Sequence, residues 1–312
     1  MPTADQKYGA CKATFLLLVL TAERKNMNSF MSWVGGKKNL RDEVLARFPP
    51  YYERYIEVFG GAGWVLFHKP PGMDFEVWND YNGNLTNLYR CVRDKPNKLK
   101  YKLRYVLNSR EDFDRIALLH KRGIFEKLCD ADRASKFYQL IRYSYASGLD
   151  SFGSQPHSMW SDFPMIDLAA RRLQKVVIEN KDFEKLIRQY DRPVSFFYCD
   201  PPYFATENYY KDVGFTAKDH IRLRDALLDI KGRFLVSYND CPEIREIWHK
   251  PNIHIEEISR LNNLAQRYDA GCQYGELLIS NYDTSARFSD EFIYGTDRRK
   301  LLLGKIIYIG YM

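Results

Sequence analysis

Residues 196–204, FFYCDPPYF, place an acidic residue and two prolines directly after a run of aromatic residues. The aromatic run predicts a buried strand, and the prolines end it, because each removes a backbone donor and fixes φ. The carbonyl groups before the prolines therefore have no helical partner and are free to accept hydrogen bonds from another group. With the carboxylate of Asp200 and the ring of Tyr203, they predict an acceptor site with a stacking surface at the carboxyl end of a strand.

The segments around this strand alternate between strand-like and helix-like patterns. RYIEVF (54–59) and FEVWND (75–80) are typical of short apolar strands, and GNLTNLYRCVRD (83–94) is typical of an amphipathic helix. Further strands are predicted within residues 175–187, 233–240, 252–258 and 274–282. This alternation predicts an α/β fold, a doubly wound and mostly parallel sheet with its site at the carboxyl ends of the strands.

A basic and helical region interrupts the alternation and ends in a loop rich in Gly, Ser and Pro. We expect this region, residues 93–164, to be an insert between the second and third strands, with residues 27–92 and 165–312 forming the other domain. Residues 1–26 contain a short apolar run with basic flanks. Because that run is too short to span a bilayer, we expect an extension or disordered segment and no membrane association, although a secretion signal would look similar.

The composition is ordinary for a soluble globular protein, and its positive charge favours an acidic partner. The chain has 312 residues, a formal charge of +7 and a pI near 8.9. Its 23 Tyr, 19 Phe and 5 Trp suit a surface that stacks bases and contacts phosphates, but a tyrosine-rich core below a basic surface explains them equally well. The six cysteines are scattered without a CxxC pair, so their spacing indicates neither a zinc site nor a disulfide framework and fits a reducing cytoplasm.

Other polar and glycine-rich motifs stand at the ends of the predicted strands. The cluster GGAG (60–63) follows the first strand, where glycines allow the backbone to approach a ligand closely. Asp80 ends the second strand and predicts either a carboxylate for ribose hydroxyls or a helix N-cap. Trp33, in SWVGGKKNL, suits an adenine-like ring or a sulfonium, and Lys37 suits a carboxylate. Taken alone, such a tryptophan is more often plain packing and such a lysine more often a solvated cation.

In the order W-x-G-G-K, F-x-G-x-G, N-D and D-P-P-Y, these motifs resemble those of the Dam-type DNA adenine-N6 methyltransferases, from about residue 31 to residue 282. The position of the insert between the two halves resembles the alpha group of amino-methyltransferases. The resemblance implies a Rossmann-like methyltransferase sheet with a helical target-recognition insert. It also implies S-adenosylmethionine as methyl donor, double-stranded DNA as substrate and no metal.

The resemblance also implies roles for individual residues. Asp200 and the carbonyl of Pro201 would accept the two N–H groups of an adenine amine, Pro202 would help to hold that carbonyl in place, and Tyr203 would stack on the base. The residues implied to contact the cofactor or to shape its pocket are Trp33, Lys37, Glu57, Phe59, Gly61, Gly63, Asp80, Asp182, Phe183 and Asp200. Asp182 and Phe183 are equally typical of a helix cap and a core ring. Val58 stands where the family usually has proline.

The stretch RYSYASGLDSFGSQPHS (142–158) falls where the family carries its recognition hairpin. The residues implied to contact DNA are Arg142, Ser147, Ser151, Ser154, Gln155 and His157. An arginine that is usual in this hairpin is missing where Asp150 or Ser151 stands, so we do not assume GATC as the target. Since a stacked base cannot reach such a pocket, we expect the adenine to be flipped out of the duplex.

Two alternatives remain at the level of sequence. The first is methylation of another planar amine, such as cytosine N4, an RNA base or a glutamine amide. Asp200 argues against it, because those relatives more often show S-P-P-Y or N-P-P-Y. The second is a DNA-binding protein that has lost catalysis, against which the intact acid, glycines and Lys37 count. We expect a monomer in the cytoplasm of a bacterial or phage-infected cell, with a cognate restriction nuclease as a partner if the role is restriction-modification.

Overall fold

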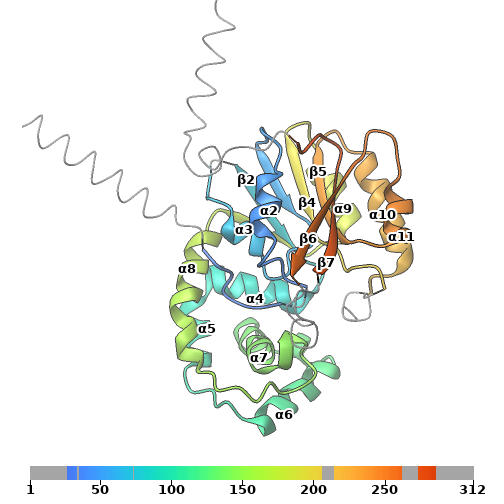
Figure 1. Cartoon of the computed structure of the whole chain (residues 1–312). Coiled ribbons are helices and arrows are strands. Elements are labelled where there is room, and N and C mark those ends of the chain that lie inside the picture. The colour runs from blue at the N-terminus through green and yellow to red at the C-terminus, as the bar shows by residue number, and fades with distance from the viewer. Residues whose placement is uncertain (1–26, 34, 73, 206–213, 262–272, 286–312) are drawn as a thin grey trace, which may run out of the picture.

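The computed structural model describes residues 27–33, 35–72, 74–205, 214–261 and 273–285 (Figure 1). The expected extension, residues 1–26, lies outside the described residues, as do residues 286–312 of the expected catalytic domain.

Seven strands form a single sheet in the order β3-β2-β1-β4-β5-β7-β6. Their bounds are Arg54–Glu57 (β1), Phe75–Asn79 (β2), Val176–Glu179 (β3), Ser195–Cys199 (β4), Arg233–Asn239 (β5), His254–Leu261 (β6) and Gln273–Ser280 (β7). The strands β1 to β5 pair in parallel, and β7 is antiparallel to both of its neighbours. The predicted doubly wound, mostly parallel sheet is therefore confirmed.

Strand β4 shows why the sheet has two covered faces. Every residue of β4 is buried, as expected for a central strand of a parallel sheet. Because successive side chains point to opposite faces, Phe196 and Tyr198 enter one apolar core while Phe197 and Cys199 enter the other.

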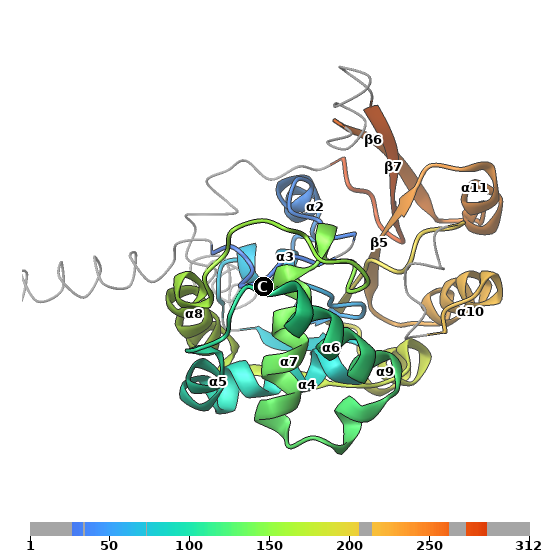
Figure 2. The same ribbon diagram turned by 90° about the horizontal axis from the view of Figure 1, so that it is seen from below.

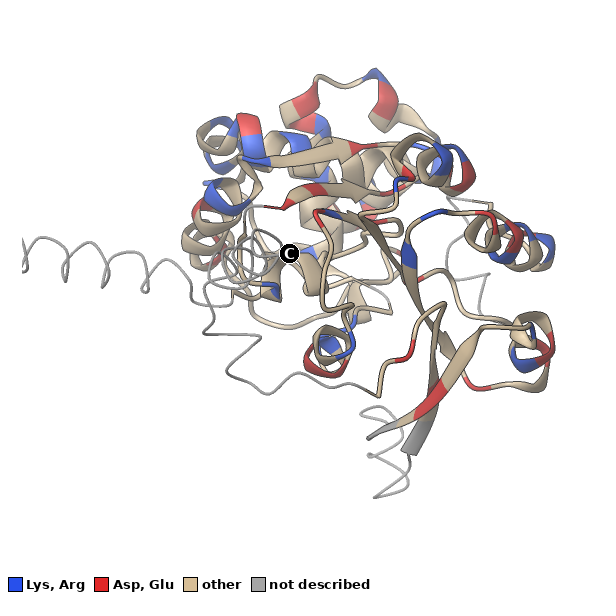
Figure 3. Ribbon diagram, turned by 90° about the horizontal axis from the view of Figure 1, so that it is seen from above, with Lys and Arg blue, Asp and Glu red and all other residues tan. Residues whose placement is uncertain are grey.

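Helices from the two halves of the chain supply these cores. Helices α2 (Arg41–Ala46), α3 (Trp64–His68), α4 (Gly83–Asp94) and α8 (Phe163–Leu173) contribute to the first core. Helices α9 (Phe183–Tyr190), α10 (Ala217–Leu228) and α11 (Pro242–Trp248) contribute to the second (Figure 1). Charged residues lie mainly on the helices and loops, while most strand residues are uncharged (Figure 3).

The predicted insert is helical and lies below the sheet in the view of Figure 1. Its elements are α5 (Pro96–Leu103), α6 (Arg110–Lys121), α7 (Asp130–Tyr143) and the short 3₁₀ helices Ile124–Lys127, Tyr145–Ser147 and Met159–Asp162. Helix α7 lies at the centre of this group in the view from below and packs against α4, α5 and α6 (Figure 2). The insert and the first face of the sheet therefore share one apolar core.

Replacing Phe197 by alanine tests the second core. The ring is fully buried, so we expect Phe197→Ala to lower the free energy of unfolding by about 3–5 kcal/mol. Urea denaturation followed by circular dichroism measures the change. The matched control is Tyr105→Ala, because Tyr105 is 81% exposed and its loss is expected to change stability by less than about 0.5 kcal/mol. Equal effects of the two substitutions would contradict this packing.

Candidate active site

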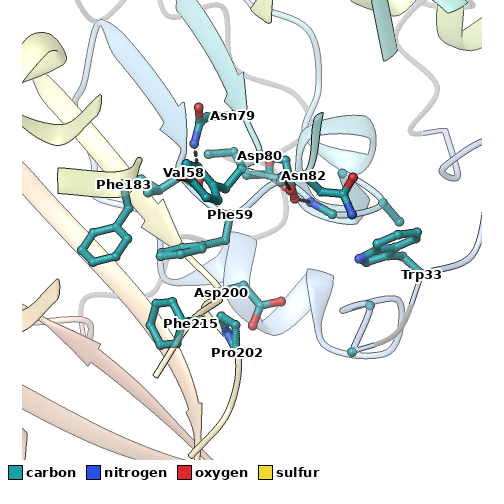
Figure 4. A pocket seen from close by; sticks show the side chains of 18 of the residues that line it. Trp33, Val58, Phe59, Asn79, Asp80, Asn82, Phe183, Asp200, Pro202 and Phe215 are labelled. Atoms are coloured by element: carbon teal, nitrogen blue, oxygen red, sulfur yellow. Dashed lines mark hydrogen bonds between the residues drawn. The ribbon is translucent and has the colours of Figure 1, made fainter. Parts of the chain in front are cut away.

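A cavity of about 970 Å³ opens at the carboxyl ends of β1, β2 and β4, and the insert bounds its other side (Figure 4). The residues predicted for catalysis or cofactor binding that line it are Trp33, Lys37, Glu57, Phe59, Gly61, Gly63, Asp80, Asp182, Phe183, Asp200 and Pro202. Pro201 and Tyr203 stand beside it in the chain but are not among its lining residues. Of the residues predicted to contact DNA, Ser147 lines the cavity.

The glycine turn after β1 has a backbone shape that side chains would disturb. Gly61 and Gly63 have φ values of +49° and +63°, in the region that favours glycine. A Cβ on Gly63 would come within 2.9 Å of the Tyr89 hydroxyl oxygen, and a Cβ on Gly61 within 3.2 Å of the Trp33 ring. The missing side chain of Gly61 thus lets the Trp33 indole ring approach the turn closely, and both residues line the cavity.

Asp80 is held at the cavity by backbone donors. Its Oδ2 accepts a hydrogen bond from the Gly61 N–H at 2.9 Å, and its Oδ1 accepts one from the Asn82 N–H at 2.8 Å. Burial raises the pKa of Asp80 to about 6, although these two hydrogen bonds oppose the shift. The alternative prediction, that Asp80 caps the next helix, is wrong, because the side chain of Asn82 accepts from the first N–H groups of α4 instead.

An aromatic group closes another side of the cavity. The ring centroids of Phe59, Phe183 and Phe215 lie 5.6–5.9 Å apart, and the guanidinium carbon of Arg222 lies 4.2 Å from the centre of the Phe183 ring. Asp182 lines the same region and is also the N-cap of α9. Its Oδ1 accepts hydrogen bonds from the first N–H groups of the helix, so the prediction of a helix cap is confirmed. The sequence analysis missed Phe215 and Arg222, since a lone aromatic residue and one arginine in an amphipathic helix carry no signal of a site.

Asp200 is ionically paired and open to the cavity at the same time. Its Oδ1 lies 2.8 Å from the Nζ of Lys37 and accepts a hydrogen bond from the Ser237 hydroxyl at 2.9 Å. Among the described residues no hydrogen bond reaches Oδ2, and Asp200 lines the cavity in which Gly61 also lies. Burial raises the pKa of Asp200, while the charge of Lys37 lowers it.

The polar ends of the Lys37 and Tyr203 side chains contact other side chains of the protein. The Lys37 side chain is only 4% exposed, and its ammonium donates to the Tyr203 hydroxyl as well as pairing with Asp200. The Tyr203 hydroxyl in turn donates to Oε2 of Glu276 at 2.7 Å. Ser237 and Glu276, from β5 and β7, were not singled out by the sequence analysis.

The predicted recognition hairpin has an internal anchor. Both guanidinium contacts of Arg142 with Asp162 measure 2.9 Å, and the Nε2 of His157 lies 2.8 Å from the same carboxylate. The other predicted DNA contacts also bind protein groups. The Ser154 hydroxyl accepts a hydrogen bond from the Arg110 guanidinium, and the Gln155 carbonyl accepts one from the Asn108 side chain. The Ser151 carbonyl accepts one from the Tyr145 N–H. Within this loop Ala146, Ser147, Leu149 and Ser154 adopt positive φ values, which non-glycine residues rarely do.

Neither a metal cluster nor a membrane helix occurs in the described part of the chain. In these ranges no group of three His, Cys, Asp or Glu side chains is placed to hold a metal ion, and no helix combines the length and apolarity needed to cross a bilayer.

A parallel sheet whose strand order reverses between β1 and β4, with a ligand cavity at the carboxyl ends of those strands, defines a Rossmann-like α/β enzyme. The family model described as D12 class N6 adenine-specific DNA methyltransferase matches residues 33–263, and the chain belongs to this family. The family predicted from the sequence motifs is therefore confirmed.

Curated relatives extend over most of the chain. The Type II methyltransferase M1.LlaDCHI of Lactococcus lactis subsp. cremoris is 28% identical over 286 residues, which cover 85% of this chain and 99% of the relative. The DNA adenine methylase of Escherichia coli K12 is 28% identical over 76% of this chain and 89% of its own length. The DNA adenine methylase of Haemophilus influenzae is 26% identical over 70% and 82%, respectively. Family and relatives together indicate an adenine-specific DNA methyltransferase.

Glu57, which also lines the cavity, generates a prediction about stability. Burial raises its pKa from 4.5 to about 8, although the hydrogen bond from Tyr55 lowers it. The folded protein therefore holds a proton that the unfolded chain releases, so this group makes folding less favourable as the pH rises from about 4.5 to 8. Glu57→Gln removes the cost, and we expect the variant to gain roughly 2–5 kcal/mol of unfolding free energy relative to the wild type between pH 5 and pH 9.

Urea denaturation at several pH values measures this difference. Glu246→Gln is the control, because Glu246 is exposed on α11 and its replacement is expected to give the same difference from the wild type at every pH. A Glu57→Gln variant whose stability follows the wild type in parallel across this range would show that the carboxyl is not protonated in the folded state.

Proposed function

We propose that the chain transfers a methyl group from S-adenosylmethionine to the N6 amine of an adenine that is flipped out of double-stranded DNA. The observation that carries the proposal is that Asp200, Asp80 and the glycine turn line one cavity. A volume of about 970 Å³ is at the upper end of the range for ligand pockets, which leaves room for a base beside a cofactor.

The residues at the glycine turn fit the proposed cofactor. Asp80 offers a carboxylate for the ribose hydroxyls, and Gly61 and the Trp33 ring line the same cavity. Phe59 and Phe183 provide aromatic faces for an adenine ring. Gly63 and Glu57 complete the same wall, with Asp182 at the aromatic end. When bound, S-adenosylmethionine supplies a methyl group on a positively charged sulfur.

Asp200 and Pro201 make the amine of the target base more nucleophilic. The lone pair of this amine is delocalised into the purine ring, so the amine attacks poorly in its planar form. We infer that one N–H donates to the Asp200 carboxylate and the other to the Pro201 carbonyl, which favours a tetrahedral nitrogen whose lone pair can form the new N–C bond. In the described residues no hydrogen bond occupies that carbonyl, and Pro202 fixes the backbone that follows it. The excess proton leaves the alkylated amine afterwards.

The proposed stacking of Tyr203 on the base needs a turn of its ring. In the structure the Nζ of Lys37 lies 4.2 Å from the ring centre, and the hydroxyl is directed toward Glu276. The Lys37 ammonium already pairs with Asp200. A proposed contact between Lys37 and the carboxylate of the cofactor would therefore have to form while that ion pair is kept.

We propose that the insert binds DNA and that the protein acts as a monomer. Ser147 and its neighbours lie at the cavity, where a flipped base must enter, and Ser151, Ser154 and Gln155 follow in the same loop. We propose that Arg142 and His157 support this loop through Asp162 and contact DNA only when that ion pair opens. A relative named as a Type II methyltransferase favours a restriction-modification role with a cognate nuclease. The relatives named DNA adenine methylases support methylation of adenine in DNA.

Methyl transfer to plasmid DNA tests the proposed function. The wild-type protein is incubated with unmethylated plasmid and S-adenosylmethionine labelled in the methyl group, and the DNA is then digested to nucleosides. We expect the label in N6-methyl-2′-deoxyadenosine and a loss of about 10²–10³ in kcat for Asp200→Asn, which removes the charge on the acceptor. Label in deoxycytidine would instead support methylation of cytosine N4. DNA binding without any label would support a DNA-binding protein that has lost catalysis.

Cofactor binding should depend on pH through Asp80. A carboxylate accepts ribose hydroxyls best when it is ionised, and burial raises the pKa of Asp80 to about 6. We therefore expect affinity for S-adenosylmethionine, measured by calorimetry, to fall between pH 7 and pH 5. Asp80→Asn should lower affinity about tenfold at pH 7 and remove this pH dependence. Asp225→Asn, at an exposed position of α10, is the control, and a pH dependence that survives in Asp80→Asn would contradict the role of Asp80.

A further inference from the structure

Glu276 is an acid in a place that normally holds an apolar residue. It lies in β7, is completely buried, and precedes Leu277, Leu278 and Ile279, which are buried as well. The strand pairs with β5 on one side and β6 on the other, so the backbone hydrogen bonds are made by the sheet and do not require an acidic side chain. Because an ionised carboxylate is costly to bury, this position calls for an explanation from its contacts.

Those contacts connect Glu276 to Asp200 through two other side chains. Its Oε2 accepts a hydrogen bond from the Tyr203 hydroxyl at 2.7 Å and lies 3.7 Å from the Nζ of Lys37. Lys37 in turn pairs with Oδ1 of Asp200 at 2.8 Å. A single buried ammonium is thus placed between two carboxylates, one directly after the end of β4 and the other within β7.

The charges of this cluster affect the proposed chemistry. When the amine attacks the methyl group, positive charge develops on nitrogen beside Asp200. Lys37 alone would cancel the negative charge of Asp200, so the pair would stabilise that positive charge only weakly. With Glu276 ionised, Lys37 is shared, and Lys37, Asp200 and Glu276 together carry one net negative charge.

We propose that Glu276 is a positioning residue that shares Lys37 with Asp200, fixes Tyr203, and keeps the cluster negative where the amine becomes positive. This inference rests on the proposed methylation of adenine. Preorganised charge of this kind acts strongly in a buried site, where little water screens it.

Several other titratable groups lie around Asp200 in the described part of the chain. They are Lys37 before α2, Glu57 from β1, Cys199 and Tyr198 from β4, Tyr203 after β4, and Glu276 from β7. Burial raises the pKa of Asp200, Lys37 opposes the shift, and the nearby charge of Glu276 adds to it. Removing the charge at 276 should therefore lower the pKa of Asp200.

The test compares Glu276→Gln with Glu276→Asp. The first variant keeps the shape and removes the charge, while the second keeps the charge on a shorter side chain. Steady-state methylation of unmethylated plasmid is measured from pH 5.5 to pH 9, and thermal unfolding is measured for each protein. Glu257→Gln is the matched control, because Glu257 lies on the neighbouring strand β6 with its side chain 67% exposed.

For Glu276→Gln we expect kcat to fall about tenfold to hundredfold, less than for a direct contact to the reacting amine, with KM for DNA changed less than about threefold. The acidic limb of kcat/KM should move to lower pH. Glu276→Asp should recover part of kcat and return the acidic limb toward its wild-type position.

Two results would overturn the inference. One is a folded Glu276→Gln with wild-type kcat and pH profile. The other is an equal loss of kcat in both variants without any shift of the acidic limb, which is what a purely structural role predicts. If Glu276→Gln does not fold, the pH profile of Glu276→Asp decides, because its displaced charge should still shift the acidic limb. A wild-type protein that never labels adenine would instead refute the proposed function itself.

Discussion

The ion pair between Lys37 and Asp200 is the contact on which the site depends. It joins the segment before the first described helix to the end of β4, and it lets a buried carboxylate remain at the cavity. A carboxylate in such a place would otherwise take up a proton, because desolvation disfavours its charge. The pairing occupies Oδ1, so the same interaction that stabilises the carboxylate leaves its Oδ2 available to accept a hydrogen bond.

The parallel pairing of β1 with β2 and β4 determines what meets at this cavity. Parallel strands end at the same edge of the sheet, so the residues that follow them become neighbours although they are far apart in the chain. The glycine turn, Asp80 and Asp200 each come directly after one of these three strands. Rigid strand ends suit a reaction in which placement supplies much of the acceleration.

The sequence predicted those parts of the protein that depend on local pattern. The run of aromatic residues at 196–198 predicts a buried strand, and the glycines and prolines mark its turns, because both follow from the neighbouring residues alone. Residues whose role depends on long-range pairing were missed. Glu276 looks like one polar residue in an apolar strand, and Asp162 looks like an ordinary loop acid, until the fold brings them to Lys37 and to Arg142. The sequence left open whether Asp80 caps α4, and the cap is Asn82, only two residues further along, which local pattern cannot separate from Asp80.

The insert and the sheet share one apolar core, in which α7 packs against α4 and side chains from both parts are buried together. This continuity has an evolutionary consequence. Under the proposed function, a new target preference would not come simply from transplanting the insert of a distant relative, because the foreign helices would have to match the steric surface of this sheet. Exchange of single side chains should disturb the core less in the loop at residues 144–154, where Leu149 and Phe152 are only partly buried against it.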